Sequence, residues 1–175
     1  GGREMLIAAL IAFYHKNLDF CEICEKILGS NYHALLGSID QTHDQMAIYH
    51  INQFEGNSEQ NTQGCKQNLD NAVMLFVTNA RVRRSIRRPK SPEEPYFSPK
   101  TIEDHNVFIC IPDIKLKVYA PLLRIISAQS LDYFAGRPNG ASPTILFSLD
   151  EFHSLGKMEI GDALRKLRKK NVRIM

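Results

Sequence analysis

Two adjacent carboxylates, Asp150 and Glu151, directly follow the apolar run ILFSL at residues 145–149. A run of this kind predicts a buried β-strand, so the two acids would stand at its carboxyl end. A strand that ends in Asp-Glu is typical of nucleoside triphosphatases, where the first carboxylate orients Mg²⁺ or its bound water and the second polarises the attacking water. The alternative interpretation is an ordinary strand that ends where it reaches solvent.

A second candidate site is the basic segment, which we define as RVRRSIRRPK at residues 81–90. Guanidinium groups bind phosphates through paired hydrogen bonds, and a cluster of them supplies the salt-dependent part of DNA affinity. Helical spacing predicts that Arg84, Arg87 and Arg88 share one face. The segment therefore predicts binding of DNA or another polyanion, and the alternative is a solvated helix end or pairing with the acidic helices of residues 1–80. Its basic residues are Arg81, Arg83, Arg84, Arg87, Arg88 and Lys90.

Cysteine and histidine could also do chemistry in this chain. Cys21 and Cys24 form a Cys-x-x-Cys pair, but no second pair or histidine pair stands at zinc-binding spacing. We expect a reduced, structural pair, with a metal or redox site as the alternative. His43 and His50 share a helical face but lack a third ligand at diagnostic spacing, so we expect no protein-held metal apart from Mg²⁺ at Asp150.

The elements that must position these residues change in character near residue 95. Residues 1–95 carry apolar side chains at helical spacing and no convincing strand, which predicts an all-helical domain. Four prolines in PKSPEEPYFSP then end the helical part. The helices are expected at about 3–16, 18–29, 31–37, 40–55 and 65–88.

After the prolines the pattern alternates between strand and helix. NVFICIP at 106–112, PTILFSLDEF at 143–152 and NVRIM at 171–175 read as strands, with helices at about 117–136 and 156–170 between them. This order predicts a parallel sheet with right-handed crossovers, in which 106–111, 144–149 and 172–175 are neighbours. Ligands of such sheets bind at the carboxyl ends of the strands, which is where the acid pair stands.

Composition agrees with two units that have different partners. The chain has 175 residues, of which 43% are hydrophobic, and a formal net charge of +3. Residues 1–80 hold four Lys/Arg against nine Asp/Glu, whereas 81–175 hold 18 against 10. The apolar run MLIAALIAFY is shorter than the roughly 20 residues that span a bilayer, so we expect a core helix there.

The segment DEFHSLGKMEIGDALRKLRKKNVRI at 150–174 resembles the corresponding segment of the type IV coupling proteins, the TraG/TraD-type hexameric ATPases of conjugation and type IV secretion. Upstream, NVFICIPDIKLKVYAPLLRIISAQSLDYF resembles the strand, Ile-Pro turn and Pro-Leu-containing helix that precede it in that family. Residues 1–95 resemble in architecture the family's all-α domain, which is inserted within a RecA-like nucleotide-binding domain. The expected fold is thus α + α/β, with an all-α, substrate-receiving domain (1–95) and an incomplete RecA-like portion (96–175).

The resemblance also implies roles for individual residues. Asp150 matches the residue that binds Mg²⁺-ATP, and Glu151 matches the catalytic base. Arg168 matches an arginine thought to reach the nucleotide of the neighbouring subunit, with a solvated basic helix end as the alternative. Asn171 stands where the family usually has glycine.

The sequence contains no phosphate loop of the form G-x-x-x-x-G-K-[ST]. We therefore expect a fragment that does not hydrolyse ATP alone. The resemblance implies that the full-length protein is a homo-hexameric ATPase that uses Mg²⁺ and ATP at the cytoplasmic side of the bacterial inner membrane. That protein would recruit a relaxase–DNA complex or an effector protein and feed it to the type IV secretion channel. The alternatives are a non-enzymatic helical adaptor and another RecA-like motor, such as an FtsK-like DNA translocase.

Overall fold

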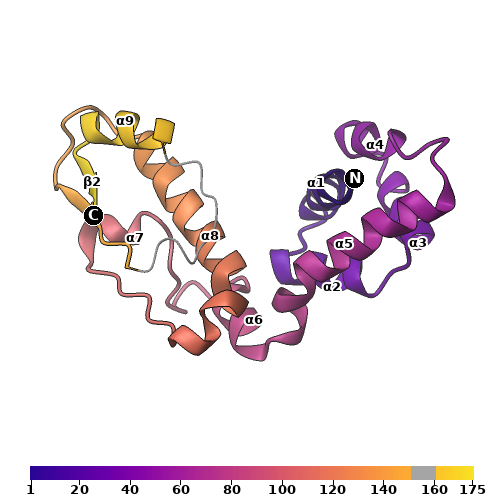
Figure 1. Cartoon of the computed structure of the whole chain (residues 1–175), viewed down its shortest axis with the longest axis horizontal. Coiled ribbons are helices and arrows are strands. Elements are labelled where there is room, and N and C mark those ends of the chain that lie inside the picture. The colour runs from indigo at the N-terminus through magenta and orange to yellow at the C-terminus, as the bar shows by residue number, and fades with distance from the viewer. Residues whose placement is uncertain (151–160) are drawn as a thin grey trace. The chain divides into compact units, whose positions relative to one another are not determined.

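The computed structural model describes residues 1–150 and 161–175, and it describes the side chains of the second range from residue 165 onward. The chain divides into two compact units, residues 1–91 and 92–175 (Figure 1). The boundary between them lies within the proline-rich segment. No strand occurs among residues 1–91, so the first unit is built from helices and their connections alone.

Side-chain caps decide where most helices of the first unit begin. Asp19, Asn31, Asp44, Ser58 and Asn79 each accept a hydrogen bond from a backbone N–H in the first turn of the helix that follows. Such caps satisfy donors that the helix itself leaves unpaired. The helices are α1 (Gly2–Tyr14), α2 (Phe20–Leu28), α3 (Tyr32–Asp40), α4 (Gln45–Asn52), α5 (Glu59–Thr78) and α6 (Ala80–Ile86).

The core of the first unit forms where α1 packs against α4 and α5 and where α2 packs against α5. Small residues on α1 let its neighbours approach closely, while Met5 and Phe13 fill the remaining volume. Phe20 and Phe76 meet edge to face, with ring centroids 5.1 Å apart. The apolar run near the N-terminus is thus a core helix, as its length predicted. Within the described part of the chain, no helix combines the length and apolar character needed to cross a membrane.

The long helix expected at 65–88 is two helices in the structure. Asn79 ends α5 in an extended conformation (φ −94°, ψ 103°), and its side chain then accepts hydrogen bonds from the N–H groups of Arg81 and Val82, 3.1 Å each. A side chain that competes for backbone donors in this way favours a new helix start over continuation. The expectation of one continuous helix was therefore wrong.

The second unit combines helices with a parallel strand pair. Its elements are α7 (Thr101–Asp104), α8 (Asp113–Ala135), β1 (Ile145–Phe147), α9 (Gly161–Lys169) and β2 (Val172–Ile174). β1 and β2 pair in parallel with Ile145 opposite Val172, and Figure 1 shows them with α9 near the C-terminal end of α8. The buried core of this unit is formed by side chains from α8, β1, α9 and β2, which are Leu131, Phe134, Ile145, Leu167 and Val172. The predicted fold class, an all-helical part followed by an incomplete α/β part, is confirmed.

The strand predicted at 106–112 does not form. The segment is irregular, and the residues Phe108 and Ile109 are 84% and 51% exposed. A strand needs a neighbouring backbone to pair with, and the sheet in the described residues contains only β1 and β2. α8 also begins earlier than expected, at Asp113, so that Pro121 lies inside it.

Candidate functional site

The carboxyl ends of β1 and β2 meet at one edge of the sheet, and Asp150 stands there. The pairing continues beyond the regular strands, because the N–H of Met175 donates to the carbonyl of Phe147 (2.9 Å) and the N–H of Leu149 donates to the carbonyl of Met175 (3.0 Å). Asp150 follows directly, in a turn, with an exposed side chain. This is the edge at which parallel sheets bind ligands. Glu151, the second acid of the pair, lies outside the described residues.

The packing beneath the strands fixes this edge. Ile145 and Val172 are buried at the opposite end of the pair, against Phe134 and Leu167. The ring of Phe147 meets Phe134 edge to face at 5.7 Å. Because both strands are held to the core along their length, the position of the backbone that carries Asp150 is set by the fold.

Arg168 lies at the other edge of the sheet. It occupies the last turn of α9, exposed, immediately before the turn that leads into the amino end of β2. The strand segment from Ile145 to Asp150 spans about 16 Å at about 3.3 Å per residue, which is further than an arginine side chain extends. The structure therefore does not bring Arg168 to Asp150 within one chain.

Asn171 provides the tight turn between α9 and β2. Its φ of 59° lies in the left-handed region, which glycine adopts easily and asparagine more often than most other residues. Its side-chain Nδ2 donates to the carbonyl of Ala141, 3.1 Å away. Asparagine thus gives this turn the backbone geometry that a glycine would give, and it adds a contact to the loop before β1.

The basic segment is not the single cationic face that helical spacing predicted. α6 ends at Ile86, and Arg87 is already extended (φ −63°, ψ 156°), so Arg84, Arg87 and Arg88 do not share a helical face. Two of its arginines are paired within the first unit. Arg83 forms an ion pair with Glu25, and the Nη1 of Arg88 donates to the side chain of Asn17 at 2.6 Å. Arg83 thus pairs with an acidic helix, as the alternative interpretation expects, whereas the guanidinium of Arg88 contacts a neutral asparagine.

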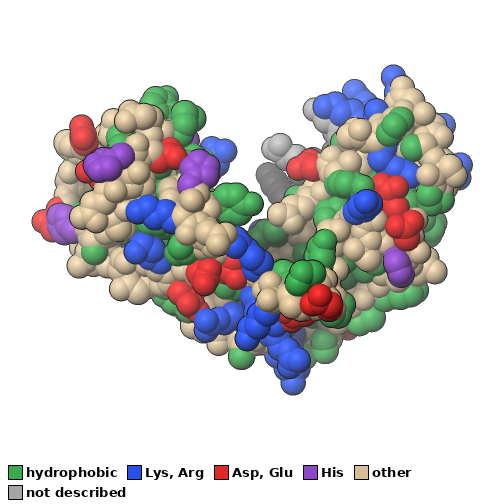
Figure 2. All heavy atoms as spheres, turned by 180° about the vertical axis from the view of Figure 1, so that it is seen from behind, with side chains coloured by type: hydrophobic (Ala, Val, Ile, Leu, Met, Phe, Trp, Pro, Cys, Tyr) green, Lys and Arg blue, Asp and Glu red, His purple; other side chains and the backbone are tan. Residues whose placement is uncertain are grey.

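Arg81 and Arg84 remain available on the surface of α6. Both are exposed, and neither guanidinium makes an ion pair or hydrogen bond with any other residue that the structure describes. Residues three apart on a helix are neighbours, so the two cations lie side by side. Figure 2 shows Lys and Arg side chains gathered around the region of α6. The two exposed guanidiniums, together with the paired ones beside them, can bind the phosphates of a polyanion.

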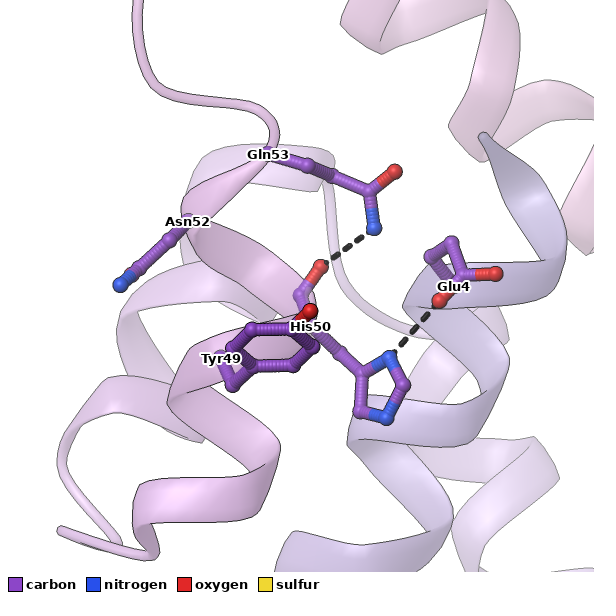
Figure 3. Close-up of a pocket in the computed structure, with 5 residues that line it drawn as sticks. All are labelled: Glu4, Tyr49, His50, Asn52 and Gln53. Atoms are coloured by element: carbon purple, nitrogen blue, oxygen red, sulfur yellow. Dashed lines mark hydrogen bonds and ion pairs between the residues drawn. The ribbon is translucent and has the colours of Figure 1, made fainter.

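An open hollow of about 590 Å³ lies between α1 and α4 and is lined by Glu4, Tyr49, His50, Asn52 and Gln53 (Figure 3). Nδ1 of His50 lies 2.7 Å from Oε2 of Glu4, and this contact lowers the pKa of the Glu4 carboxyl. Gln53 donates from Nε2 to the carbonyl of His50 at 2.8 Å. The polar groups of the hollow thus bind one another and connect two helices.

Among the residues that the structure describes, no three His, Cys, Asp or Glu side chains gather as a metal site.

The Cys-x-x-Cys pair is buried on α2, and both thiols are free. Burial raises the pKa of Cys21 to about 11 and that of Cys24 to about 12. The thiolate is the form that attacks disulfides and binds metals, so these two thiols are poor nucleophiles and poor ligands.

Arg137 is a further residue of the second unit, and no sequence pattern indicated a role for it. The residue follows α8 and is buried, and its guanidinium donates to backbone carbonyls of two other segments, one before β1 and one before β2. Nothing in the local sequence AGRPNG distinguishes it from a surface arginine.

The model of the family described as type IV secretory system conjugative DNA transfer matches residues 24–175. The chain belongs to this family. Comparisons with curated proteins and with solved structures gave no match. The conjugative DNA transfer family model spans the basic segment, the parallel strand pair and the acid-bearing edge together. The chain therefore takes part in conjugative DNA transfer by a type IV secretory system.

Proposed function

We propose that the chain is part of a type IV coupling protein, in which the second unit contributes to an ATPase site and the first unit receives the transfer substrate. One observation carries the proposal: the parallel pair β1–β2 places Asp150 at its carboxyl edge, in a chain that belongs to the conjugative DNA transfer family. Parallel sheets bind their ligands at this edge.

Within this proposal, Asp150 and Glu151 divide the chemistry of ATP hydrolysis. An exposed carboxylate at a rigid strand end suits a hard cation, so Asp150 fits a Mg²⁺ ion through a bound water. Bound Mg²⁺ would neutralise charge on the transferred phosphate. Glu151 would accept the proton of the attacking water.

The position of Arg168 supports a role between subunits. Since it lies at the sheet edge opposite Asp150, its guanidinium would serve the nucleotide of a neighbouring subunit in a homo-hexamer. An arginine supplied from outside stabilises transition-state charge in many phosphoryl-transfer enzymes. A complete site would also need a phosphate loop, which this sequence does not contain.

The first unit would recruit a relaxase–DNA complex or an effector protein. Arg81 and Arg84 would supply exposed guanidiniums for DNA phosphates. The proposed place of action is the cytoplasmic side of the bacterial inner membrane, in contact with the other components of the type IV secretion system.

The test uses the whole coupling protein that contains this chain. Glu151→Gln keeps the size of the side chain but removes the base, so ATP turnover should fall by roughly 10²–10⁴-fold while nucleotide affinity and hexamer formation stay near normal. Glu55→Gln changes an exposed acid of the first unit and serves as the matched control. Full turnover in Glu151→Gln would show that the acid pair is an ordinary strand end. In that case plasmid transfer between cells would be measured with and without the protein. A loss of transfer without the protein would indicate a non-enzymatic adaptor, and unchanged transfer would indicate a protein with no part in transfer.

A further inference from the structure

Arg137 is a buried cation that joins three segments of the second unit. Its side chain is only 5% exposed, and its Nη1 donates to the carbonyl of Pro143 (3.1 Å) and to that of Lys170 (3.5 Å). Its Nη2 lies 3.6 Å from Oε2 of Glu103 on α7. The guanidinium also lies over the ring of Phe134, 5.5 Å from its centroid.

This arrangement does more than fill space. Burying a charge is costly, and an apolar side chain could occupy the same volume without that cost. Only a multivalent donor, however, can bind carbonyl groups from the loop before β1 and from the turn between α9 and β2 at the same time. Arg137 therefore connects the loop before β1 and the turn between α9 and β2 through one side chain.

Two further contacts hold the same turn against the same loop. The N–H of Gly140 donates to the carbonyl of Lys169 at 2.9 Å, and Asn171 donates from its side chain to Ala141. Arg168 is part of this structure, because its own carbonyl accepts the N–H of Asn171 at 3.3 Å. Contacts with the loop before β1 thus hold the backbone next to Arg168 in place, while the side chain of Arg168 stays exposed.

We propose that Arg137 is a positioning residue for Arg168. By locking the turn between α9 and β2 to the loop before β1, it fixes the direction in which Arg168 leaves the surface towards the nucleotide of a neighbouring subunit. If the turn were mobile, the guanidinium of Arg168 would sample many orientations, and most of its contribution to catalysis would be lost. The inference rests on the proposed role of Arg168.

The first experiment measures the turn itself and needs no activity. Amide hydrogen exchange is followed at residues 171–174 and at Ile145, whose N–H donates to the carbonyl of Asn171. Arg137→Met should raise exchange at these amides by about tenfold or more, while Arg165→Met, a change at an exposed position of α9, should leave it unaltered. If Arg137→Met does not fold, Arg137→Lys keeps the charge and one donor group, and it should give a smaller increase at the same amides. Unchanged exchange in the folded variants would overturn the inference.

The second experiment is a double-mutant cycle on ATP turnover in the whole protein. Arg137→Lys should lower kcat by about 10- to 100-fold with KM little changed, and combining it with Arg168→Ala should add nothing to the loss from Arg168→Ala alone. Additive losses would overturn the inference and leave the proposed function intact. Full turnover in Arg168→Ala would overturn both the proposed role of Arg168 and this inference.

Discussion

The imidazole of His50 and the carboxylate of Glu4 tie the last turn of α4 to the first turn of α1, with Nδ1 and Oε2 2.7 Å apart. A second pair of the same kind closes the other end of these two helices. Nδ1 of His15, which caps α1, lies 2.9 Å from Oδ2 of Asp44, which begins α4. The antiparallel α1–α4 pair is therefore clamped at both ends by a histidine and a carboxylate.

This clamp should make the stability of the first unit depend on pH in the acid range. The hydrogen bond from His50 holds the pKa of Glu4 below its usual value of 4.5, and the backbone N–H of Ala47, followed by His15, lowers the pKa of Asp44. A carboxyl with a lowered folded-state pKa stabilises the fold fully above its unfolded pKa, and this contribution is lost as the pH falls through the folded value.

We therefore expect the melting temperature of the chain to drop as the pH falls below about 4.5, and the drop to be smaller in Glu4→Gln. Circular dichroism melts from pH 7 to pH 3 measure this difference. Glu55→Gln, at an exposed position, is the control and should follow the wild type. Identical pH profiles for Glu4→Gln and the wild type would exclude a contribution from the clamp.

Asp19 provides a second test, because one side chain performs two tasks. Its Oδ1 accepts the N–H of Glu22 at 2.9 Å to start α2, and its Oδ2 accepts the N–H of Arg88 at 3.1 Å. Asp19→Ala should lower the free energy of unfolding by about 1–2 kcal/mol. Asp19→Asn keeps the cap but not the second acceptor, so its loss should be clearly smaller. Urea unfolding compares the variants, and equal losses in both would mean that the cap contributes little.

The basic segment makes a prediction about DNA affinity at different salt concentrations. Replacing Arg81 and Arg84 together with alanine should reduce the slope of log affinity against log salt by about 1.8, at about 0.9 for each lost phosphate contact. Arg83→Ala should change the slope less, since Arg83 is paired with Glu25. Fluorescence anisotropy with a labelled duplex measures the slopes. If the double variant keeps the wild-type slope, Arg81 and Arg84 do not contact DNA phosphates.

The cysteines should differ widely in reactivity. At pH 8, a pKa of about 11 leaves Cys21 with a thiolate fraction of about 10⁻³, and Cys24 has less. Cys110 is exposed and should react quickly with an aromatic disulfide reagent. Cys110→Ser should remove the fast phase, while Cys21 and Cys24 should react only after unfolding. Rapid labelling of either buried thiol in the folded chain would contradict this order.

Much of the fold could be predicted because its signals are local. Met5, Ala9 and Phe13 recur at helical spacing, and all three are buried on α1. The apolar runs around Ile145 and Val172 predicted strands, and the helix between them predicted a parallel crossover connection. The structure shows the parallel pairing of these strands.

The rest depends on partners that a local pattern does not reveal. The run at 106–112 has the composition of a strand, yet no described strand pairs with it. Asn79 looks like an ordinary polar residue inside a long helical pattern, and only its side-chain contacts show that a new helix starts there. Arg137 is buried because residues at 103, 143 and 170 surround it, and no window of the sequence contains all of them.

Asn79 also interrupts the regular rotation of residues around the helix axis between α5 and α6. In an unbroken helix each residue advances by about 100°, so the direction of Arg81 and Arg84 would be dictated by every residue of α5 before them. Because α6 starts afresh at Asn79, the direction of these cations is set by a single cap. A substitution at Asn79 can therefore redirect Arg81 and Arg84 without changing the faces of α5. One side chain thus sets where the exposed arginines of α6 point relative to the longest helix of the first unit.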